Sequence, residues 1–278
     1  MENLNEFDLI IEPGRSEKNY WNDLLRFREL FIFMAWRDIL VRYKQTAIGL
    51  SWSIIRPILT MIIFTVVFGR IAKLPSGGVP YPILVFAGLL PWQFFSTSFT
   101  DASGSLIGNS NMLTKLYFPR LIIPTSTVIV NLVDFFISFL ILIGLMAWYH
   151  FVPTWAILCL PLFLFLAFVA SLSAGLYVAA LNVKYRDFKY IVPFVVQLGM
   201  YISPVGFNSN IIVQPKLRLL YSLNPMVGII DGFRWAILGG ENHIFWPGML
   251  LSIGITILLL IFSIKYFRKM EKTFADII

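Results

Sequence analysis

The 278-residue chain has little of the chemistry that most enzymes and metalloproteins use. It holds one cysteine, Cys159, and two histidines, and only 13% of its residues are charged. A single cysteine excludes an intrachain disulfide and a metal site built from several thiolates. No Gly-x-x-x-x-Gly-Lys-Ser/Thr sequence is present that could hold nucleotide phosphates in a loop of that type. We therefore expect no metal, no catalytic site and no cofactor in this chain.

Apolar residues, by contrast, are abundant in this chain. They account for 58% of the sequence, with 26 phenylalanines and a mean hydropathy of +0.78. A helix needs about 20 mainly apolar residues to cross the hydrocarbon of a bilayer. The sequence predicts an all-α integral membrane protein, a single domain over 1–278, with six spans at 50–70, 81–107, 121–149, 155–182, 191–207 and 245–266.

The basic residues predict the orientation of these spans. Most of the 22 lysines and arginines precede the first span, follow the last, or lie in the second and fourth connections. Such a bias places these segments and both termini in the cytoplasm. Anionic lipid of the inner leaflet accounts for the net charge of +7, so no nucleic-acid partner is expected.

The segment before the first span predicts an amphipathic helix over 15–49 that lies along the cytoplasmic face of the membrane. On a helical projection, four apolar side chains share one side and four charged side chains lie outside it. The apolar set is Trp36, Ile39, Leu40 and Tyr43, and the charged set is Arg37, Asp38, Arg42 and Lys44. A plain membrane-surface anchor is the alternative interpretation of the same pattern.

Two cytoplasmic connections carry further patterns. In the first, over 109–124, Met112, Leu113, Leu116 and Tyr117 recur at helical spacing before a proline. This short apolar face either packs against its own bundle or docks into a partner, and the pattern favours neither. The second, over 183–190, is rich in charge, and fixing the topology is one sufficient role for it.

The stretch 208–244 predicts a gate on the outer side. It is too long for a tight turn and too apolar for a free loop, and prolines and glycines interrupt it. Its apolar segment over 226–238 is too short to cross a bilayer. Broken backbone at membrane depth is tolerated where protein or a water-filled cavity satisfies it. We expect a pair of re-entrant or surface-lying helices here.

The charged residues that fall inside the predicted spans, away from their last two positions, are Arg56, Asp101 and Asp134. A proton relay would need several carboxylates or histidines on facing helices, and an intramembrane transferase would need a converging catalytic set. Neither is present. We expect Asp134 to be hydrogen-bonded within the bundle. Arg56 either meets a phosphate head group or pairs locally, and the sequence does not decide between the two.

Several short motifs, taken in order, resemble those of type-2 ABC exporters. They comprise Arg37-Asp38, Arg42-Tyr43-Lys44, Gly49-Leu50, Trp52 and Pro57, then Asn111 through Phe118-Pro119-Arg120, Tyr185-Arg186-Asp187, Ser203-Pro204-Val205 and Leu223-Asn224-Pro225-Met226. The likeness covers almost the whole chain and is greatest to permeases that export O-antigen, capsule or teichoic-acid polymers on a lipid carrier. It places the chain in the inner (plasma) membrane of a bacterium.

The resemblance implies a half-transporter. Two copies of the chain would form the pathway, and two copies of a separate ATPase would bind ATP and Mg²⁺. The coupling helix that docks into the ATPase would comprise Asn111, Met112, Leu113, Lys115, Leu116, Tyr117 and Phe118. The interface helix and the cytoplasmic mouth would include Arg37, Asp38, Arg42, Tyr43, Lys44, Tyr185, Arg186 and Asp187.

For the pathway itself, sugar rings stack on aromatic side chains, so an aromatic wall could hold a polymer by many weak contacts. The candidate channel residues are Arg56, Phe64, Phe68, Tyr201 and Phe207, with core or lipid-facing packing as the alternative for each aromatic. The candidate outer-gate residues are Pro204, Asn224, Pro225, Met226 and Arg234. The predicted function is export of lipid-linked polysaccharide. A small-lipid or drug exporter is the first alternative, and an intramembrane transferase is a remote one.

Overall fold

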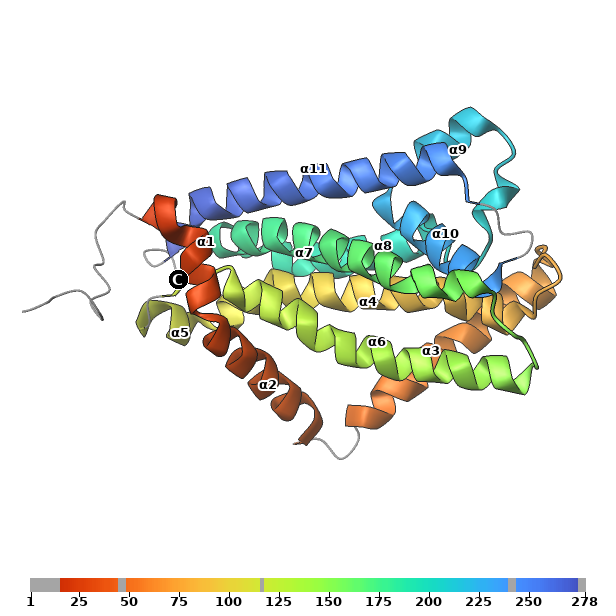
Figure 1. Ribbon diagram of the computed structural model, residues 1–278, viewed down its shortest axis with the longest axis horizontal. Coiled ribbons are helices and arrows are strands. Elements are labelled where there is room, and N and C mark those ends of the chain that lie inside the picture. The colour runs from red at the N-terminus through yellow and green to blue at the C-terminus, as the bar shows by residue number, and fades with distance from the viewer. Residues whose placement is uncertain (1–15, 45–48, 116–117, 240–243, 275–278) are drawn as a thin grey trace, which may run out of the picture.

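The computed structural model describes residues 16–44, 49–115, 118–239 and 244–274, and every regular element in these ranges is a helix (Figure 1). The elements are α1 (Ser16–Arg26), α2 (Arg28–Lys44), α3 (Gly49–Phe64), η1 (Thr65–Ile71), α4 (Tyr81–Gly108), α5 (Ser110–Lys115), α6 (Ile122–Trp148), η2 (Trp155–Cys159), α7 (Leu160–Lys184), α8 (Phe188–Ile202), η3 (Ser209–Ile211), α9 (Pro215–Tyr221), α10 (Pro225–Leu238) and α11 (Trp246–Glu271).

Helix α4 forms the centre of the bundle, with α6 and α7 packed along it. Of its most apolar stretch 78% is buried, compared with 17% for the span Ser51–Ile71. Small residues allow the close approach: a Cβ added at Gly175 of α7 would lie 2.6 Å from the Cβ of Ala102 in α4. The span that contains α3 therefore lies at the edge of the bundle.

Within the described ranges, five helical segments are long and apolar enough to cross a bilayer: Ser51–Ile71, Tyr81–Gly108, Ile122–Trp148, Trp155–Lys184 and Trp246–Glu271. The predicted spans 81–107 and 121–149 agree with α4 and α6 to within a residue at each end. All-helical architecture is confirmed.

The predicted helix over 191–207 is wrong at its carboxyl end, because α8 stops at Ile202. Ser203 is extended (φ −85°, ψ 151°), the conformation that a following proline imposes, and Pro204 follows it. With 15 residues, α8 is about 22 Å long, which is shorter than a hydrocarbon core.

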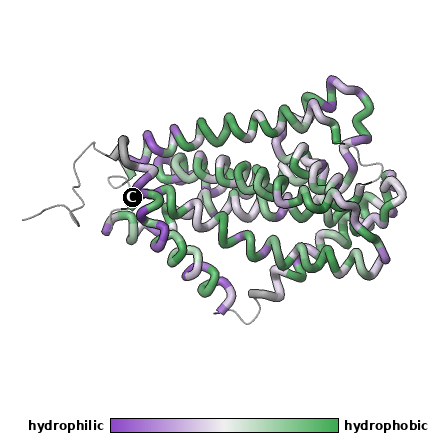
Figure 2. Tube along the Cα trace, in the orientation of Figure 1, coloured by the Kyte–Doolittle hydropathy of each residue, from purple (hydrophilic) through white to green (hydrophobic). Residues whose placement is uncertain are grey.

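The ends of the bundle differ from its middle. Helices α1, α2 and α5 gather at the end where the chain finishes, and α9 and α10 lie at the opposite end (Figure 1). Hydrophilic residues concentrate at these two ends, and the stretch between them is mainly apolar (Figure 2). This distribution matches a membrane protein whose two described termini lie on one side.

The helix predicted over 15–49 is two helices, with the boundary at Phe27. Backbone hydrogen bonds from Phe27 to Asp23 and from Phe31 to Phe27 continue across it, so the boundary is a bend. Helix α2 leaves several large apolar side chains exposed: Ile32, Phe33, Trp36, Leu40 and Val41. Its last turn instead directs Arg42 and Tyr43 toward α6.

The predicted gate region contains α9 and α10. Helix α10 is not on the surface, since most of its residues from Met226 to Leu238 are buried against α4, α7 and α11. Gly232 allows this packing: a Cβ there would come within 2.3 Å of the Phe163 ring. Helix α10 is thus packed inside the bundle, and its re-entrant position in the membrane stays a prediction.

Candidate functional site

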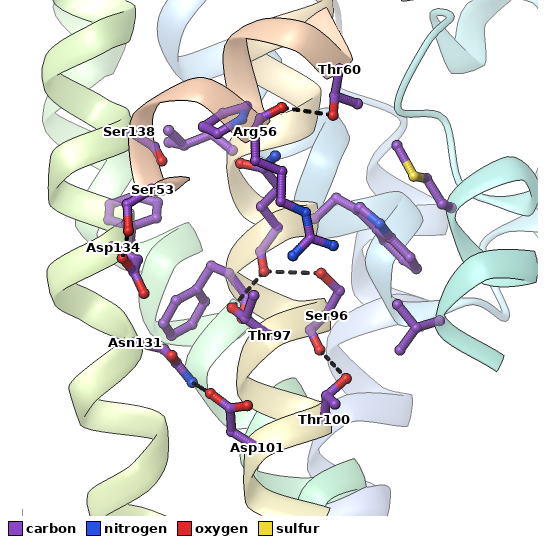
Figure 3. A pocket seen from close by; sticks show the side chains of 18 of the residues that line it. Ser53, Arg56, Thr60, Ser96, Thr97, Thr100, Asp101, Asn131, Asp134 and Ser138 are labelled. Atoms are coloured by element: carbon purple, nitrogen blue, oxygen red, sulfur yellow. Dashed lines mark hydrogen bonds between the residues drawn. The ribbon is translucent and has the colours of Figure 1, made fainter. Parts of the chain in front are cut away.

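A cavity of about 580 Å³ opens between α3, α4, α6 and α8 (Figure 3). Its polar lining is Ser53, Arg56, Thr60, Gln93, Ser96, Thr97, Thr100, Asp101, Asn131, Asp134, Ser138 and Gln197. Its aromatic lining is Trp52, Trp92, Phe94 and Phe135. Hydroxyl, amide and carboxylate groups beside indole and phenyl rings are suited to a ligand that is both polar and ring-bearing.

Only one of the five predicted channel residues, Arg56, lines this cavity. Phe64 is buried and packs edge-to-face on Phe68, with their ring centroids 5.3 Å apart. Both rings pack close to Gly206, on which a Cβ would meet them. Tyr201 is exposed on α8, and Phe207 accepts a hydrogen bond through its carbonyl from Arg234. Packing within the chain, the alternative stated for the aromatics, describes Phe64 and Phe68.

One wall of the cavity contains an ion cluster that joins three helices. The Arg42 guanidinium of α2 donates to Asp101 Oδ2 of α4 (2.7 Å) and to Asp134 Oδ2 of α6 (2.8 Å). It also donates to Asn131 Oδ1 (2.6 Å). One guanidinium thus bridges two carboxylates and compensates one of their two negative charges inside an apolar bundle.

Asp134 is hydrogen-bonded as predicted. In addition to the bond from Arg42, its Oδ1 accepts from the Tyr43 hydroxyl (2.7 Å) and from the Ser53 hydroxyl (2.6 Å). Burial raises the pKa of Tyr43, and the bond to Asp134 raises it further, so the phenol stays neutral and donates. Asp134 therefore anchors the end of α2 and the start of α3.

The role of Arg42 was missed from the sequence. The projection placed it among charged residues away from the apolar arc, yet its side chain reaches into the bundle. The two aspartates inside apolar spans were a signal that a cation must lie nearby. No pattern in a single sequence indicates which of many basic residues supplies it, because the partners are 59 and 92 positions apart.

Arg56 behaves differently from Arg42. Its guanidinium points into the cavity in Figure 3 and has no hydrogen-bond or ion-pair partner among the described residues. Its backbone carbonyl accepts from Thr60. Nearby hydroxyls on α4, those of Ser96, Thr97 and Thr100, donate to carbonyls of their own helix. Of the two roles left open for Arg56, local pairing is not observed.

Helix α5 projects from the end of the bundle near α2. Leu113 and the following Phe118 are buried against the bundle, whereas Asn111 and Lys115 are exposed and Met112 is half-buried. Leu116 and Tyr117 lie outside the described residues. The buried pair shows that part of the predicted apolar face packs on its own chain.

Polar contacts tie the surroundings of α5 to three other helices. Arg37 of α2 donates to Asn109 Oδ1 at the end of α4 (3.1 Å), and it also pairs with Asp38 (2.7 Å). The Arg120 backbone N–H donates to Glu271 of α11 (2.8 Å), which also accepts from Tyr20 of α1 (3.5 Å). A displacement of α5 would therefore be transmitted through these hydrogen bonds to α1, α2 and α11.

The other predicted cytoplasmic residues do not reach the cavity. Lys44, Arg186 and Asp187 are exposed, and the Lys184 ammonium lies 5.1 Å from the centre of the exposed Tyr185 ring. These residues line the connection between α7 and α8 and the end of α2.

The predicted outer-gate residues form one packed unit. Arg234 is 1% exposed and donates to the carbonyls of Leu84 (3.3 Å), Val205 (2.8 Å) and Phe207. Asn224 caps α10 by accepting from the Met226 N–H (3.0 Å). Its amide donates to Ser203 Oγ (2.9 Å), beside the buried Pro204; Pro225 takes the first turn of α10. Carbonyls of α4 and of the broken backbone after α8 therefore hold Arg234 inside the bundle, at the end opposite the described termini.

Comparison with known proteins identifies the family to which the chain is related. The ABC-2 type transporter model matches residues 29–238. The chain is 28% identical to the O-antigen export system permease protein RfbA of Myxococcus xanthus, over 91% of this chain and 97% of that protein. It is 26% identical to the protein of the same name from Klebsiella pneumoniae, over 90% and 95%.

A third relative is the polysialic acid transport protein KpsM of Escherichia coli. It is 24% identical over 73% of this chain and 79% of that protein. The family match extends from the start of α2 to the end of α10 and so includes the cavity, the ion cluster and the buried helix α10. The chain therefore belongs to the ABC-2 type transporter family and is a membrane transport subunit.

Proposed function

We propose that this chain is the permease subunit of an ATP-driven exporter that moves lipid-linked polysaccharide, with O-antigen the first candidate, from the cytoplasmic to the outer side of a bacterial inner membrane. The observation that carries the proposal is the cavity, whose wall combines four aromatic rings with twelve polar side chains. Relatives named for O-antigen export and polysialic acid transport support the same substrate class.

The mixed wall suits sugar better than a purely apolar cargo. Indole and phenyl faces stack on the C–H faces of sugar rings, and amides and carboxylates exchange hydrogen bonds with hydroxyl groups. Many weak contacts of this kind hold a chain in place without stopping its movement.

The proposal includes partners. Energy would come from two copies of an ATPase that hold ATP and Mg²⁺, received on the α5 side of the bundle. A second copy of this chain would complete the pathway. Helices α3 and α8, which flank the cavity, expose rows of large apolar side chains suited to a copy or to membrane lipid: Ile55, Leu59, Ile62, Phe194, Leu198 and Tyr201.

In this proposal the chain crosses the membrane six times. Helix α8, although short, makes the fifth crossing together with the backbone after it, and both termini are cytoplasmic. Helix α10 is re-entrant from the outer side, where Arg234 satisfies the broken backbone that such a helix brings into the membrane.

The work stroke follows from the contacts around α5. Closure of the two ATPases would push α5, and the Arg37 to Asn109 bond would pass the movement to α2. Because Arg42 connects α2 to α4 and α6, the displacement would reach the cavity wall. Helices α3 and α8 would then part at the seam between two copies, and the polymer would advance past the outer gate.

The test of the docking step is an acidic substitution in the coupling segment. Leu116→Asp or Tyr117→Asp should leave ATP hydrolysis by the partner intact and lower polymer export at least about 10-fold, because a charge in an apolar contact is costly. The measurement is the ratio of polymer exported to ATP hydrolysed. Val213→Asp is the control, since Val213 is 87% exposed in the connection before α9. Unchanged coupling in both variants would contradict the docking assignment.

A further inference from the structure

The guanidinium of Arg56 has no hydrogen-bond or ion-pair partner among the described residues, and burying such a group in a membrane costs free energy. Arg56 lies about 10 Å, or seven residues, along α3 from its start. A guanidinium at membrane depth is expensive unless it meets water, a counter-charge or backbone oxygens. None of the described residues supplies a hydrogen bond or an ion pair to the exposed Arg56, so its guanidinium is open to a ligand that enters the cavity.

The acidic residues of the same cavity do not fill this role, because both form their ion pairs with Arg42 and not with Arg56. Asp134 accepts hydrogen bonds from Arg42, Tyr43 and Ser53, and Asp101 Oδ2 accepts from Arg42 and Asn131. The two aspartates and two arginines sum to zero charge. An incoming anion would therefore be held by its nearness to Arg56 and not by a net positive cavity.

Other donors in the cavity point to the same ligand chemistry. The amides of Gln93 on α4 and Gln197 on α8 line the cavity and have no hydrogen-bond partner among the described side chains. Together with Arg56 on α3, they place free N–H donors on three separate walls. By contrast, the hydroxyls of Ser96, Thr97 and Thr100 already donate hydrogen bonds to carbonyls of α4.

From these contacts we propose that the cavity recognises a phosphoryl group, and that Arg56 is the residue that binds it. The planar guanidinium matches phosphate oxygens in a bidentate geometry, which a point-charge ammonium does not reproduce. This inference rests on the proposed function, because it assigns to the site the phosphorylated end of a lipid-linked substrate. The amides of Gln93 and Gln197 would donate to the remaining oxygens.

The experiment measures binding of hexadecyl phosphate to the purified full chain in phosphatidylcholine nanodiscs, with hexadecanol as the uncharged ligand. Wild-type protein should bind hexadecyl phosphate about 10- to 100-fold more tightly than hexadecanol, the range for a charge-assisted hydrogen bond. Arg56→Gln should remove this difference, and Arg56→Lys should keep part of it. Arg70→Gln, at an exposed arginine outside the cavity lining, is the matched control and should bind as wild type does.

Inorganic phosphate separates the two sources of the anion. Competition with hexadecyl phosphate would assign recognition to the phosphoryl group alone, and lack of competition would assign it to a lipid-borne head group. Equal binding of hexadecanol and hexadecyl phosphate, or full binding by Arg56→Gln with an unchanged thermal midpoint, would overturn the inference. Phosphate binding that depends on Arg56, in a chain whose complex exports no polymer, would keep this site and reject the polysaccharide proposal.

Discussion

Replacing Arg42 by methionine should destabilise the protein by about 2–3 kcal/mol. Removing one partner of a buried ion pair costs about 3–5 kcal/mol, and exposure of roughly a third of these side chains lowers that figure. Asp101 and Asp134 would be left facing each other without a cation. We expect the thermal midpoint of the purified chain to fall by about 5–10 °C.

Two further variants make the Arg42 prediction specific. Arg28→Met, at an exposed position of the same helix, should change the midpoint little. Combining Arg42→Met with Asp101→Asn and Asp134→Asn should recover much of the loss, because the uncompensated charges are then gone. A single Arg42→Met variant as stable as wild type would show that the cluster does not hold α2 on the bundle.

Arg234→Met should lower the stability of the protein by a similar or larger amount, and its effect should be located at the opposite end of the bundle. The substitution leaves the carbonyls of Val205 and Phe207 without their donor in a fully buried place, whereas the Leu84 carbonyl keeps its helical hydrogen bond within α4. Each buried unsatisfied polar group costs about 1–3 kcal/mol, so we expect a total loss of at least about 2 kcal/mol. The segment 203–207 should detach from α4 first, and its amide hydrogens should exchange faster.

Hydrogen exchange followed by mass spectrometry measures this local effect. Arg70→Met, at an exposed arginine of η1, is the matched control and should leave exchange over 203–207 unchanged. A second variant, Gly88→Ala, should act in the same direction, since a Cβ there would lie 2.6 Å from Arg234 Nη2. Unaltered exchange in Arg234→Met would mean that the guanidinium does not hold this backbone.

The long helices were predictable because their signal is local. A long, mainly apolar run defines α4 and α6, and polar residues or prolines mark their ends. The error at α8 came from counting apolar residues through Pro204, although a proline restricts the residue before it. The burial of α10 was predicted only in part, because its length excluded a membrane crossing but did not indicate that the helix packs inside the bundle.

The site was predictable only where one residue was anomalous by itself. A carboxylate in an apolar run must find donors, and Asp134 does so. Its donors come from α2 and α3, whose side-chain directions depend on how the helices pack. The cavity wall combines four helices that are distant in sequence, so residues such as Gln93 and Gln197 carried no signal of their own.

The most direct test of the account is transport by reconstituted protein. Proteoliposomes would contain this chain, with or without its ATPase, and lipid-linked polysaccharide labelled at its sugar end. Transfer of the label across the bilayer would be followed by protection from an added glycosidase. The account predicts transfer only when the chain, the ATPase and ATP are all present. Transfer by this chain without the ATPase, or no transfer by the complete system, would contradict it.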